Sequence, residues 1–297
     1  MTKKMDKKNI GIVVLSYPDY RETDIYINLI KQLEMAGVIY KEIDLSMFGV
    51  NNEAFLLDEN YESSNFISVG GDGTALKGMY FAYLSDSILL PLGLGEIGYL
   101  VNSDKRKFRK LIKQIIDNSY DQHDTTKRTV ISCPSLDPAW PIFNEIALTK
   151  TGNNTLLKFN IQFENESVDV KADGLIISTA GGSTAYSYSA GGPIVDPSIE
   201  SVIITPIAPF SKFPRSIVLP SNNLIKVNID TPTSFKTKDK MTCDIFFDGV
   251  LVNDLLEISV GRNEPVSLEV IKNHNKVKLL GVSGNLNVRE FLSQILR

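Results

Sequence analysis

The sequence predicts an α/β N-terminal domain with a parallel sheet, followed by a β-rich C-terminal domain. Up to about residue 121, apolar positions at helix spacing alternate with short apolar runs that are typical of buried strands. From about residue 122, apolar residues alternate with polar ones, and turn signals such as Asp248-Gly249 separate the runs. Alternating strands and helices indicate a parallel sheet with right-handed crossovers, whereas the second pattern indicates mostly β structure.

Helices and strands can be predicted in both halves. The first helix is expected to end at Gly37. In the first half, strands are expected at residues 10–15, 66–69 and 88–91, and helices with apolar faces at residues 26–33, 76–83 and 108–115. In the second half, strands are expected at residues 159–163, 168–170, 224–229 and 244–247, and a final helix has its apolar face at residues 288–295.

Charge, apolar runs and cysteine content indicate which binding partners and which cellular compartment to expect. The 297 residues carry a net charge of -4, which gives no electrostatic case for nucleic acid or for a membrane surface. No apolar run approaches the ~20 residues that a transmembrane helix needs. Cys133 and Cys243 are too few for a disulfide framework, so a reducing cytoplasm is the expected location.

A glycine-rich turn follows the second expected strand. Residues 65–78 read NFISVGGDGTALKG, so a buried strand runs through a glycine turn into an amphipathic helix. This order suits a phosphate site, because glycines let backbone N–H groups approach an anion and the helix N-terminus adds partial positive charge. The string matches neither the P-loop nor the Gly-x-Gly-x-x-Gly pattern.

Asp72 is the informative residue of this turn. A carboxylate beside phosphates would repel them unless a cation intervenes or the carboxylate handles a proton. Two functions therefore fit Asp72, accepting a proton from an attacking hydroxyl or holding Mg²⁺. The structural alternative is that Asp72 caps the following helix.

A second cluster covers residues 172–195, ADGLIISTAGGSTAYSYSAGGPIV. Its short hydroxyls and open backbone suit a ribose and amide groups, and Tyr186 could stack on a ring. Asp173 could accept hydrogen bonds from a ribose diol. A glycine-rich turn that serves packing is the alternative. Asn144-Glu145 is a polar pair within an apolar run, and burying it without partners would be costly, so we expect a polar partner.

Taken together, these motifs resemble the ATP-dependent NAD kinase family, within the superfamily that also contains diacylglycerol kinases. The resemblance covers most of the chain in order. It is carried by residues 70–74 (GGDGT), 94–100 (LGEIGYL), 144–145 (NE), 173–174 (DG), 182–187 (GSTAYS), 189–193 (SAGGP), 205–209 (TPIAP) and 215–220 (RSIVLP).

The resemblance implies transfer of the ATP γ-phosphate to the 2′-hydroxyl of the adenosine ribose of NAD, giving NADP. It implies a nucleotide-binding α/β domain over residues 1–121, with segment 281–297 packing back on it, and an NAD-binding β-rich domain over residues 122–280. A cleft between the domains and a homodimer or homotetramer are also implied, with small nucleotides as the ligands.

The resemblance to the family also implies roles for individual residues. Asp72 would be the base or metal-side carboxylate beside the acceptor hydroxyl. Mg²⁺, or another divalent cation, would hold the triphosphate together with the turn residues Gly70, Gly71, Gly73 and Thr74. Asn144 and Glu145 would hold the NAD ribose and neighbouring groups, and Asp173 a ribose diol. The nucleoside pockets would be lined by Thr184, Ala185, Tyr186 and Ser189.

Two rival functions stay open. The sequence departs from the family pattern at Pro91, Gly93 and Glu96, so a kinase of the same superfamily with another nucleoside-type acceptor is one alternative. The other is a non-catalytic dinucleotide-binding sensor. The presence of Asp72, Asn144, Glu145 and Asp173 together argues against the sensor, because a pure binder has no need of a carboxylate beside phosphate.

Overall fold

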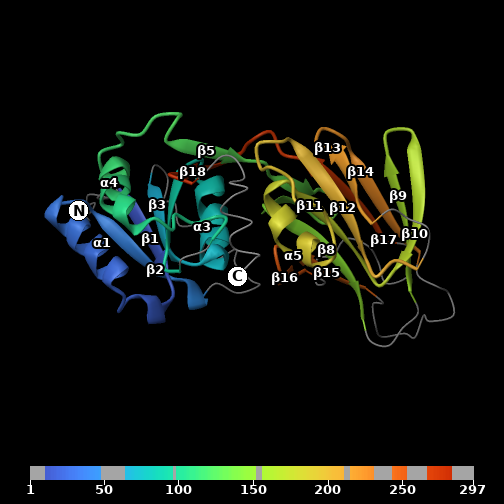
Figure 1. The fold of residues 1–297 in the computed structure, drawn as a ribbon, viewed down its shortest axis with the longest axis horizontal. Coiled ribbons are helices and arrows are strands. Elements are labelled where there is room, and N and C mark those ends of the chain that lie inside the picture. The colour runs from blue at the N-terminus through green and yellow to red at the C-terminus, as the bar shows by residue number, and fades with distance from the viewer. Residues whose placement is uncertain are drawn as a thin grey trace, which may run out of the picture. The chain divides into compact units, whose positions relative to one another are not determined.

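The computed structural model describes residues 11–47, 64–95, 98–151, 156–210, 215–230, 243–252 and 266–282. These residues form two compact units (Figure 1). Unit 1 contains the described residues up to Lys127 together with those from Val277, and unit 2 runs from Arg128 to Lys276. The final helix expected at residues 288–295 lies outside the described residues, as does Glu96.

Unit 1 is built on one sheet. Its strands are β1 (Ile12–Ser16), β2 (Tyr40–Asp44), β3 (Asn65–Gly70), β4 (Ile88–Gly93), β5 (Thr125–Arg128) and β18 (Val277–Leu280). They lie in the order β2-β1-β3-β4-β18-β5. The pairs β1–β2, β1–β3, β3–β4 and β4–β18 are all parallel, which confirms the predicted α/β class. The chain thus returns to this sheet after unit 2, because β18 pairs with β4.

Helices cover both faces of this sheet (Figure 1). They are α1 (Asp24–Met35), α3 (Asp72–Leu84) and α4 (Lys105–Ile116), with 3₁₀ turns η1 (Pro18–Tyr20) and η2 (Leu45–Met47). Leu29 of α1 and Ile112 of α4 share a buried cluster with Leu90 of β4. Gly78 of α3 lies against Leu89, the next residue of β4, and successive strand residues point to opposite faces. Therefore α3 covers the face opposite to α1 and α4.

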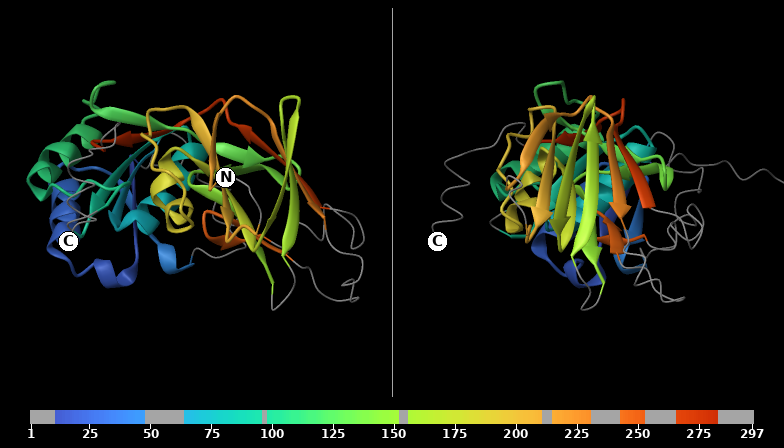
Figure 2. Two further views of the ribbon diagram at one scale, coloured as in Figure 1. Left: turned by 45° about the vertical axis from the view of Figure 1, so that its right-hand side comes forward. Right: turned by 90° about the vertical axis from the view of Figure 1, so that its right-hand side faces the viewer.

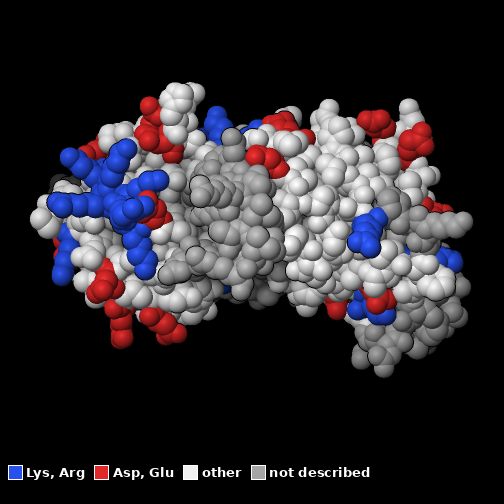
Figure 3. Space-filling view, viewed as in Figure 1, with Lys and Arg blue, Asp and Glu red and all other residues white. Residues whose placement is uncertain are grey.

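All three predicted helices form, and the predicted apolar faces of α1 and α4 are confirmed. The apolar face predicted for α3 is wrong: of its positions at helix spacing only Met79 is buried, and the helix packs through its small residues and Phe81 instead. Thr23 caps α1 by accepting from the Tyr26 N–H, and Gly37 follows its last turn with a positive φ of 65°. The start of α4 is exposed and basic, and Figure 3 shows its Lys and Arg side chains gathered on one face of unit 1. The apolar side of α4 is buried, so the helix is held by packing while its charges remain in solvent.

Unit 2 consists of two antiparallel sheets (Figures 1 and 2). The first contains β6 (Ile131–Cys133), β7 (Asp137–Ile142), β9 (Leu157–Phe163), β10 (Glu166–Ala172), β14 (Ile225–Asp230) and β17 (Val266–Lys272), in the order β10-β9-β14-β17-β6-β7. The second contains β8 (Glu145–Lys150), β11 (Gly174–Thr179), β12 (Ser201–Ile207), β13 (Ile217–Pro220), β15 (Cys243–Phe247) and β16 (Val250–Leu251), in the order β13-β12-β11-β8-β15-β16. The predicted β-rich second half is confirmed.

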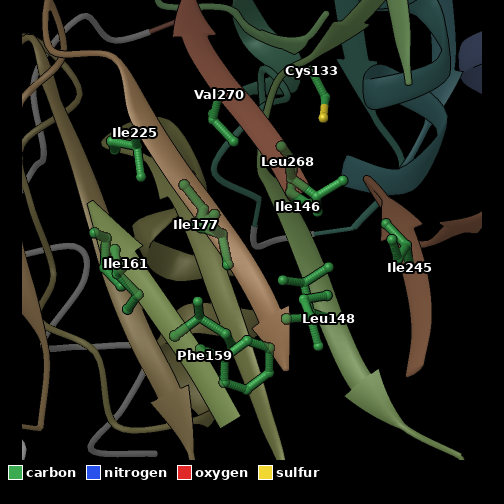
Figure 4. Packing of buried hydrophobic residues seen from close by; sticks show 14 of the residues in the cluster. Cys133, Ile146, Leu148, Phe159, Ile161, Ile177, Ile225, Ile245, Leu268 and Val270 are labelled. Atoms are coloured by element: carbon green, nitrogen blue, oxygen red, sulfur yellow. The ribbon is translucent and has the colours of Figure 1, made fainter. Parts of the chain in front are cut away.

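One buried cluster joins the two sheets of unit 2. Figure 4 shows Phe159 and Ile161 of β9 pointing toward the side where Leu148 of β8 and Ile177 of β11 lie. The alternation of apolar residues that predicts β9 therefore reflects burial of one face against the second sheet. After β11, the chain forms the 3₁₀ turn η4 (Gly181–Thr184) and the short helix α5 (Tyr186–Ser189). No helix in the described part of the chain is long and apolar enough to cross a membrane.

Gly174 at the start of β11 gives a test of this packing. A Cβ at this position would lie 2.4 Å from the backbone oxygen of Leu148 and 2.8 Å from Cδ1 of Ile207. Because a backbone atom cannot move aside, we expect Gly174→Ala to lower the free energy of unfolding by about 1–3 kcal/mol in urea titrations. Gly181→Ala is the control, since its nearest contact would be Thr179 Oγ1 at 3.5 Å. Equal stability of the two variants would contradict the packing argument.

Candidate functional site

The glycine turn lies where β3 ends and α3 begins, at the carboxyl edge of the parallel sheet, where ligands of such sheets usually bind. Gly70 is required by packing, because a Cβ there would lie 2.2 Å from Thr74 Oγ1. Gly71 and Gly73 are different. Both are exposed, and a Cβ on either would meet nothing within 4 Å. Their lack of side chains therefore leaves the backbone open to a ligand, as a phosphate site needs.

Asp72 is the first residue of α3, and its side chain turns away from the helix. Oδ2 accepts the N–H of Tyr99 at 2.9 Å, and Oδ1 accepts the N–H of Leu100 at 2.9 Å. The N-cap position is occupied by Gly71, and no side chain caps this helix. The capping interpretation of Asp72 is therefore wrong, because the carboxylate is held by a separate segment of the chain.

Gly98 lets this segment approach the carboxylate. A Cβ at Gly98 would lie 2.8 Å from Asp72 Oδ1 and 2.2 Å from Cγ2 of Val101. The carboxylate oxygens together offer about four acceptor positions, and the two backbone N–H groups occupy two of them. Asp72 is thus fixed in place and retains acceptor capacity for a hydroxyl proton or a cation.

Of the family-pattern departures at Pro91 and Gly93, the structure explains the glycine. The Pro91 carbonyl accepts both the backbone N–H and the side-chain amide of Asn102, each at 2.9 Å. A Cβ at Gly93 would lie 2.8 Å from the carbonyl oxygen of Asn102. Gly93 therefore serves the close packing of the segment around Asn102 against β4, whereas the Pro91 carbonyl would accept the same bonds from any residue type.

In unit 2 the structure brings the Asn144-Glu145 pair to the turn that follows β11. The N–H of Thr179 donates to the Asn144 carbonyl at 2.9 Å. Gly182 lies on the Asn144 backbone so closely that a Cβ would be 2.2 Å from its carbonyl oxygen. The N–H of Tyr186 donates to the Glu145 carboxylate. Two motifs that are distant in the sequence thus form one cluster.

The hydroxyl residues of this cluster divide into two groups. Ser183 and Ser187 are buried, and they bond to Val195 and to Thr205 respectively. Ser189 and Tyr186 are exposed, and Thr184 and Ala185 are partly exposed. The predicted lining residues Thr184, Ala185, Tyr186 and Ser189 are therefore accessible, while the buried serines hold the turn.

Asp173 does not join this cluster. It precedes β11, whereas Ser178, near the other end of β11, pairs with Glu145. At ~3.3 Å per residue, Asp173 and Glu145 are separated along the strand by roughly 16 Å. Asp173 instead forms an ion pair with Lys150, with 2.5 Å between Oδ1 and Nζ. Its role as a ribose ligand stays a prediction.

Asp248 is the residue that the sequence did not assign to this cluster. Its carboxylate accepts the N–H groups of Phe143 at 2.8 Å, Asn144 at 2.7 Å and Glu145 at 3.0 Å. The sequence marks Asp248-Gly249 only as a turn signal, and both residues do have positive φ between β15 and β16. No sequence rule links this turn to a loop more than a hundred residues earlier.

Glu145 and Asp248 both have raised pKa values. Burial, with the Asp248 carboxylate as a smaller cause, raises the pKa of Glu145 to about 8, against the opposing effect of the Tyr186 N–H. Burial also raises the pKa of Asp248 to about 6, although three backbone N–H groups favour its charged form. In the described part of the chain, no group of three or more His, Cys, Asp or Glu residues is placed to hold a metal ion.

The raised pKa of Glu145 predicts a pH-dependent stability. A carboxyl group whose folded pKa exceeds its ordinary value of 4.5 favours folding at low pH, and this contribution is lost as pH rises through about 8. Between about pH 6.5 and about pH 9, the wild-type protein should therefore lose at least ~1 kcal/mol of unfolding free energy relative to Glu145→Gln. Denaturant titrations of both proteins measure this difference. A constant difference across that range would show that Glu145 does not titrate there.

The chain is similar to several known proteins. The family described as ATP-NAD kinase C-terminal domain matches residues 143–277. The NAD kinase of Flavobacterium johnsoniae is 31% identical over 247 residues, covering 81% of this chain and 77% of that protein. A bifunctional NADP phosphatase/NAD kinase of Methanococcus maripaludis is 31% identical over 79% of this chain. The matched region covers only 43% of the length of that protein.

Solved structures share the fold. An NAD kinase from Archaeoglobus fulgidus in complex with ATP matches with a TM-score of 0.66 and 20% identity, over 96% of this chain and 97% of that one. Yeast NADH kinase complexed with NADH matches with a TM-score of 0.69 and 20% identity, over 97% of this chain and 88% of that one. Because the similarity to the Flavobacterium johnsoniae enzyme extends over more than two thirds of both chains, the protein belongs to the NAD kinase family.

Proposed function

We propose that this chain is an ATP-dependent NAD kinase, which transfers the γ-phosphate of ATP to the 2′-hydroxyl of the adenosine ribose of NAD and so makes NADP. One observation carries the proposal. The Asp72 carboxylate lies beside open glycine backbone, is fixed by the N–H groups of Tyr99 and Leu100, and retains acceptor capacity. Family membership and the ATP and NADH complexes of the solved relatives support the same reaction.

The donor triphosphate is assigned to the glycine turn of unit 1. Gly71 and Gly73 present exposed backbone without side chains, and α3 begins at Asp72. The N-terminus of a helix carries about half a positive charge, which stabilises an adjacent anion. Gly70 and Thr74 shape the turn by packing against each other.

Asp72 is assigned the proton transfer. It accepts the proton of the ribose 2′-hydroxyl while a bond forms between that oxygen and the γ-phosphorus. The bond between the γ-phosphorus and the bridging oxygen breaks, and ADP leaves. Phosphoryl transfer depends mainly on alignment and charge neutralisation, so a carboxylate of fixed orientation is what the protein needs to supply.

The nucleoside of the acceptor is assigned to the cluster of unit 2. Asn144 and Glu145 would bind the ribose and neighbouring groups, and Asp173 remains a proposed ribose ligand. The exposed ring of Tyr186 is available for stacking on a base. The pocket walls would be completed by Thr184, Ala185 and Ser189.

A divalent cation, normally Mg²⁺, would enter as the Mg–ATP complex. The described residues supply no metal cluster of their own, but the remaining acceptor positions of Asp72 suit a cation held mainly by phosphates. The cation would neutralise phosphate charge. The glycine turn and Asp72 would orient the bound nucleotide.

Location and assembly are further proposals. Cys133 and Cys243 are both buried free thiols, which supports a reducing cytoplasm. The family resemblance supports a homodimer or homotetramer. Neither nucleic acid nor a membrane is proposed as a partner.

Two rivals are separated by one assay. The protein is incubated with ATP, Mg²⁺ and NAD, and NADP is measured with a coupled dehydrogenase. Product supports the NAD kinase. Binding of NAD without product supports a sensor. The absence of both NADP formation and NAD binding supports a kinase for another nucleoside-type acceptor.

Substitution of Asp72 tests whether its carboxylate accepts the proton of the acceptor hydroxyl. Asp72→Asn removes the base and should lower kcat by about 10²–10⁴-fold, with the far-ultraviolet circular dichroism spectrum unchanged. Asp86→Asn is the matched control in unit 1, because Asp86 is exposed and its positive φ of 46° is tolerated by asparagine. Turnover of Asp72→Asn within a few-fold of the control would remove Asp72 from the proton transfer.

Cation removal tests the phosphate chemistry. With no metal cluster among the described residues, chelation should abolish NADP formation without unfolding the protein, and added Mg²⁺ should restore it. Activity and circular dichroism are recorded on the same sample. Full activity in excess chelator would contradict the assignment of a cation to the triphosphate.

A further inference from the structure

We propose that Asp248 is a positioning residue for the acceptor nucleoside: together with Thr179, it holds the Phe143–Glu145 peptide so that Asn144 and Glu145 face the ligand. This inference rests on the proposed function, since it takes the ligand of these two residues to be the nucleoside part of NAD. Asp248 itself is bonded to the backbone of this loop and is not assigned any contact with the ligand.

The Asp248 carboxylate binds one side of this loop. The loop connects β7 to β8, and the carboxylate accepts three successive N–H groups there, with Oδ2 on Phe143 and Oδ1 on both Asn144 and Glu145. The backbone N–H of Asp248 in turn donates to the Glu145 carbonyl at 3.0 Å. Four hydrogen bonds therefore join one residue of the β15–β16 turn to three consecutive residues.

Thr179 holds the other side of the same peptide. Its N–H donates to the Asn144 carbonyl at 2.9 Å, and its hydroxyl donates to the Phe143 carbonyl at 2.6 Å. Gly182 packs directly on the Asn144 backbone. It is held there by its own N–H, which donates to Thr179 Oγ1 at 3.0 Å. Both the N–H and the C=O of Phe143 and Asn144 are thus occupied, so the peptide planes cannot rotate independently.

Asn144 is partly exposed. The direction of its side chain is set by its backbone, which Asp248 and Thr179 fix from opposite sides. Glu145 is fixed in the same way and is further held by the N–H of Tyr186. The ligand-facing groups therefore depend on a carboxylate that lies in a different strand pair.

The choice of aspartate supports a role beyond the turn itself. A two-residue hairpin turn with positive φ is well served by Asn-Gly, which would bury no charge. Aspartate at position 248 places a second carboxylate beside the buried Glu145, which is unfavourable. Its advantage is that both carboxylate oxygens accept, whereas an asparagine would present an NH₂ group to one of the three N–H donors.

Asp248→Asn is the direct test, because it keeps the shape and changes one acceptor into a donor. Hydrogen exchange measured by mass spectrometry should show faster exchange of the amides of residues 143–145, in the protein without ligand. The Kd for NAD should rise by about tenfold or more, as expected for a buried donor left unsatisfied. The Kd for ATP should change by less than about twofold, since the hydrogen bonds of Asp248 involve none of the residues assigned to the triphosphate.

Asp169→Asn is the matched control. Asp169 is an exposed aspartate of unit 2 with a single side-chain hydrogen bond, to Asn160, and its substitution should change none of the three measurements. If Asp248→Asn does not fold, Thr179→Val and Thr179→Ser replace it. The valine loses the hydroxyl bond to Phe143 and should weaken NAD binding, while the serine retains the hydroxyl and should not.

The outcomes are distinguishable. A folded Asp248→Asn protein with unchanged exchange at residues 143–145, or with faster exchange but unchanged NAD affinity, overturns the inference. Equal NAD affinity of Thr179→Val and Thr179→Ser does the same. A wild-type protein that binds no NAD overturns the proposed function, and with it the ligand part of this inference, before any variant is compared.

Discussion

The two hydrogen bonds that hold the Asp72 carboxylate are the interaction on which the chemistry of this protein depends. A carboxylate at the first position of a helix would normally turn back to its own N-terminal amides, which attract it through the helix dipole. Here the N–H groups of Tyr99 and Leu100 compete successfully. They draw the side chain away from the helix end, so the helix amides and the glycine backbone remain available to an anion.

In unit 2, too, a carboxylate is held by backbone N–H groups. The Asp248 carboxylate is also held by backbone N–H groups rather than by lysine or arginine. Backbone donors fix an acid without adding a mobile cation, and their geometry is set by the strands from which they come. The cost is desolvation, which is visible in the raised pKa values of Asp248 and Glu145.

Two physical classes of glycine matter for the candidate sites. Gly70, Gly98, Gly174 and Gly182 are required because a side chain would collide with fixed neighbours. Gly71 and Gly73 meet no neighbour and do not need a left-handed backbone, so packing does not explain them. Only the second class points directly to a ligand. The sequence pattern alone cannot separate the two, because both appear as the same letter in the same motif.

Local sequence patterns predict the α/β and β-rich halves, the helices α1, α3 and α4, and the motif residues Asp72, Asn144 and Glu145. These follow from local periodicity and from unusual residues within apolar runs, which neighbouring positions reveal. Which groups meet depends on the folded structure. It turned Asp72 toward Tyr99, placed Asp173 beside Lys150 at the far end of β11, and brought Asp248 to Phe143 across 105 residues of chain. Such contacts arise from strand order and packing of the whole unit, which no local pattern encodes.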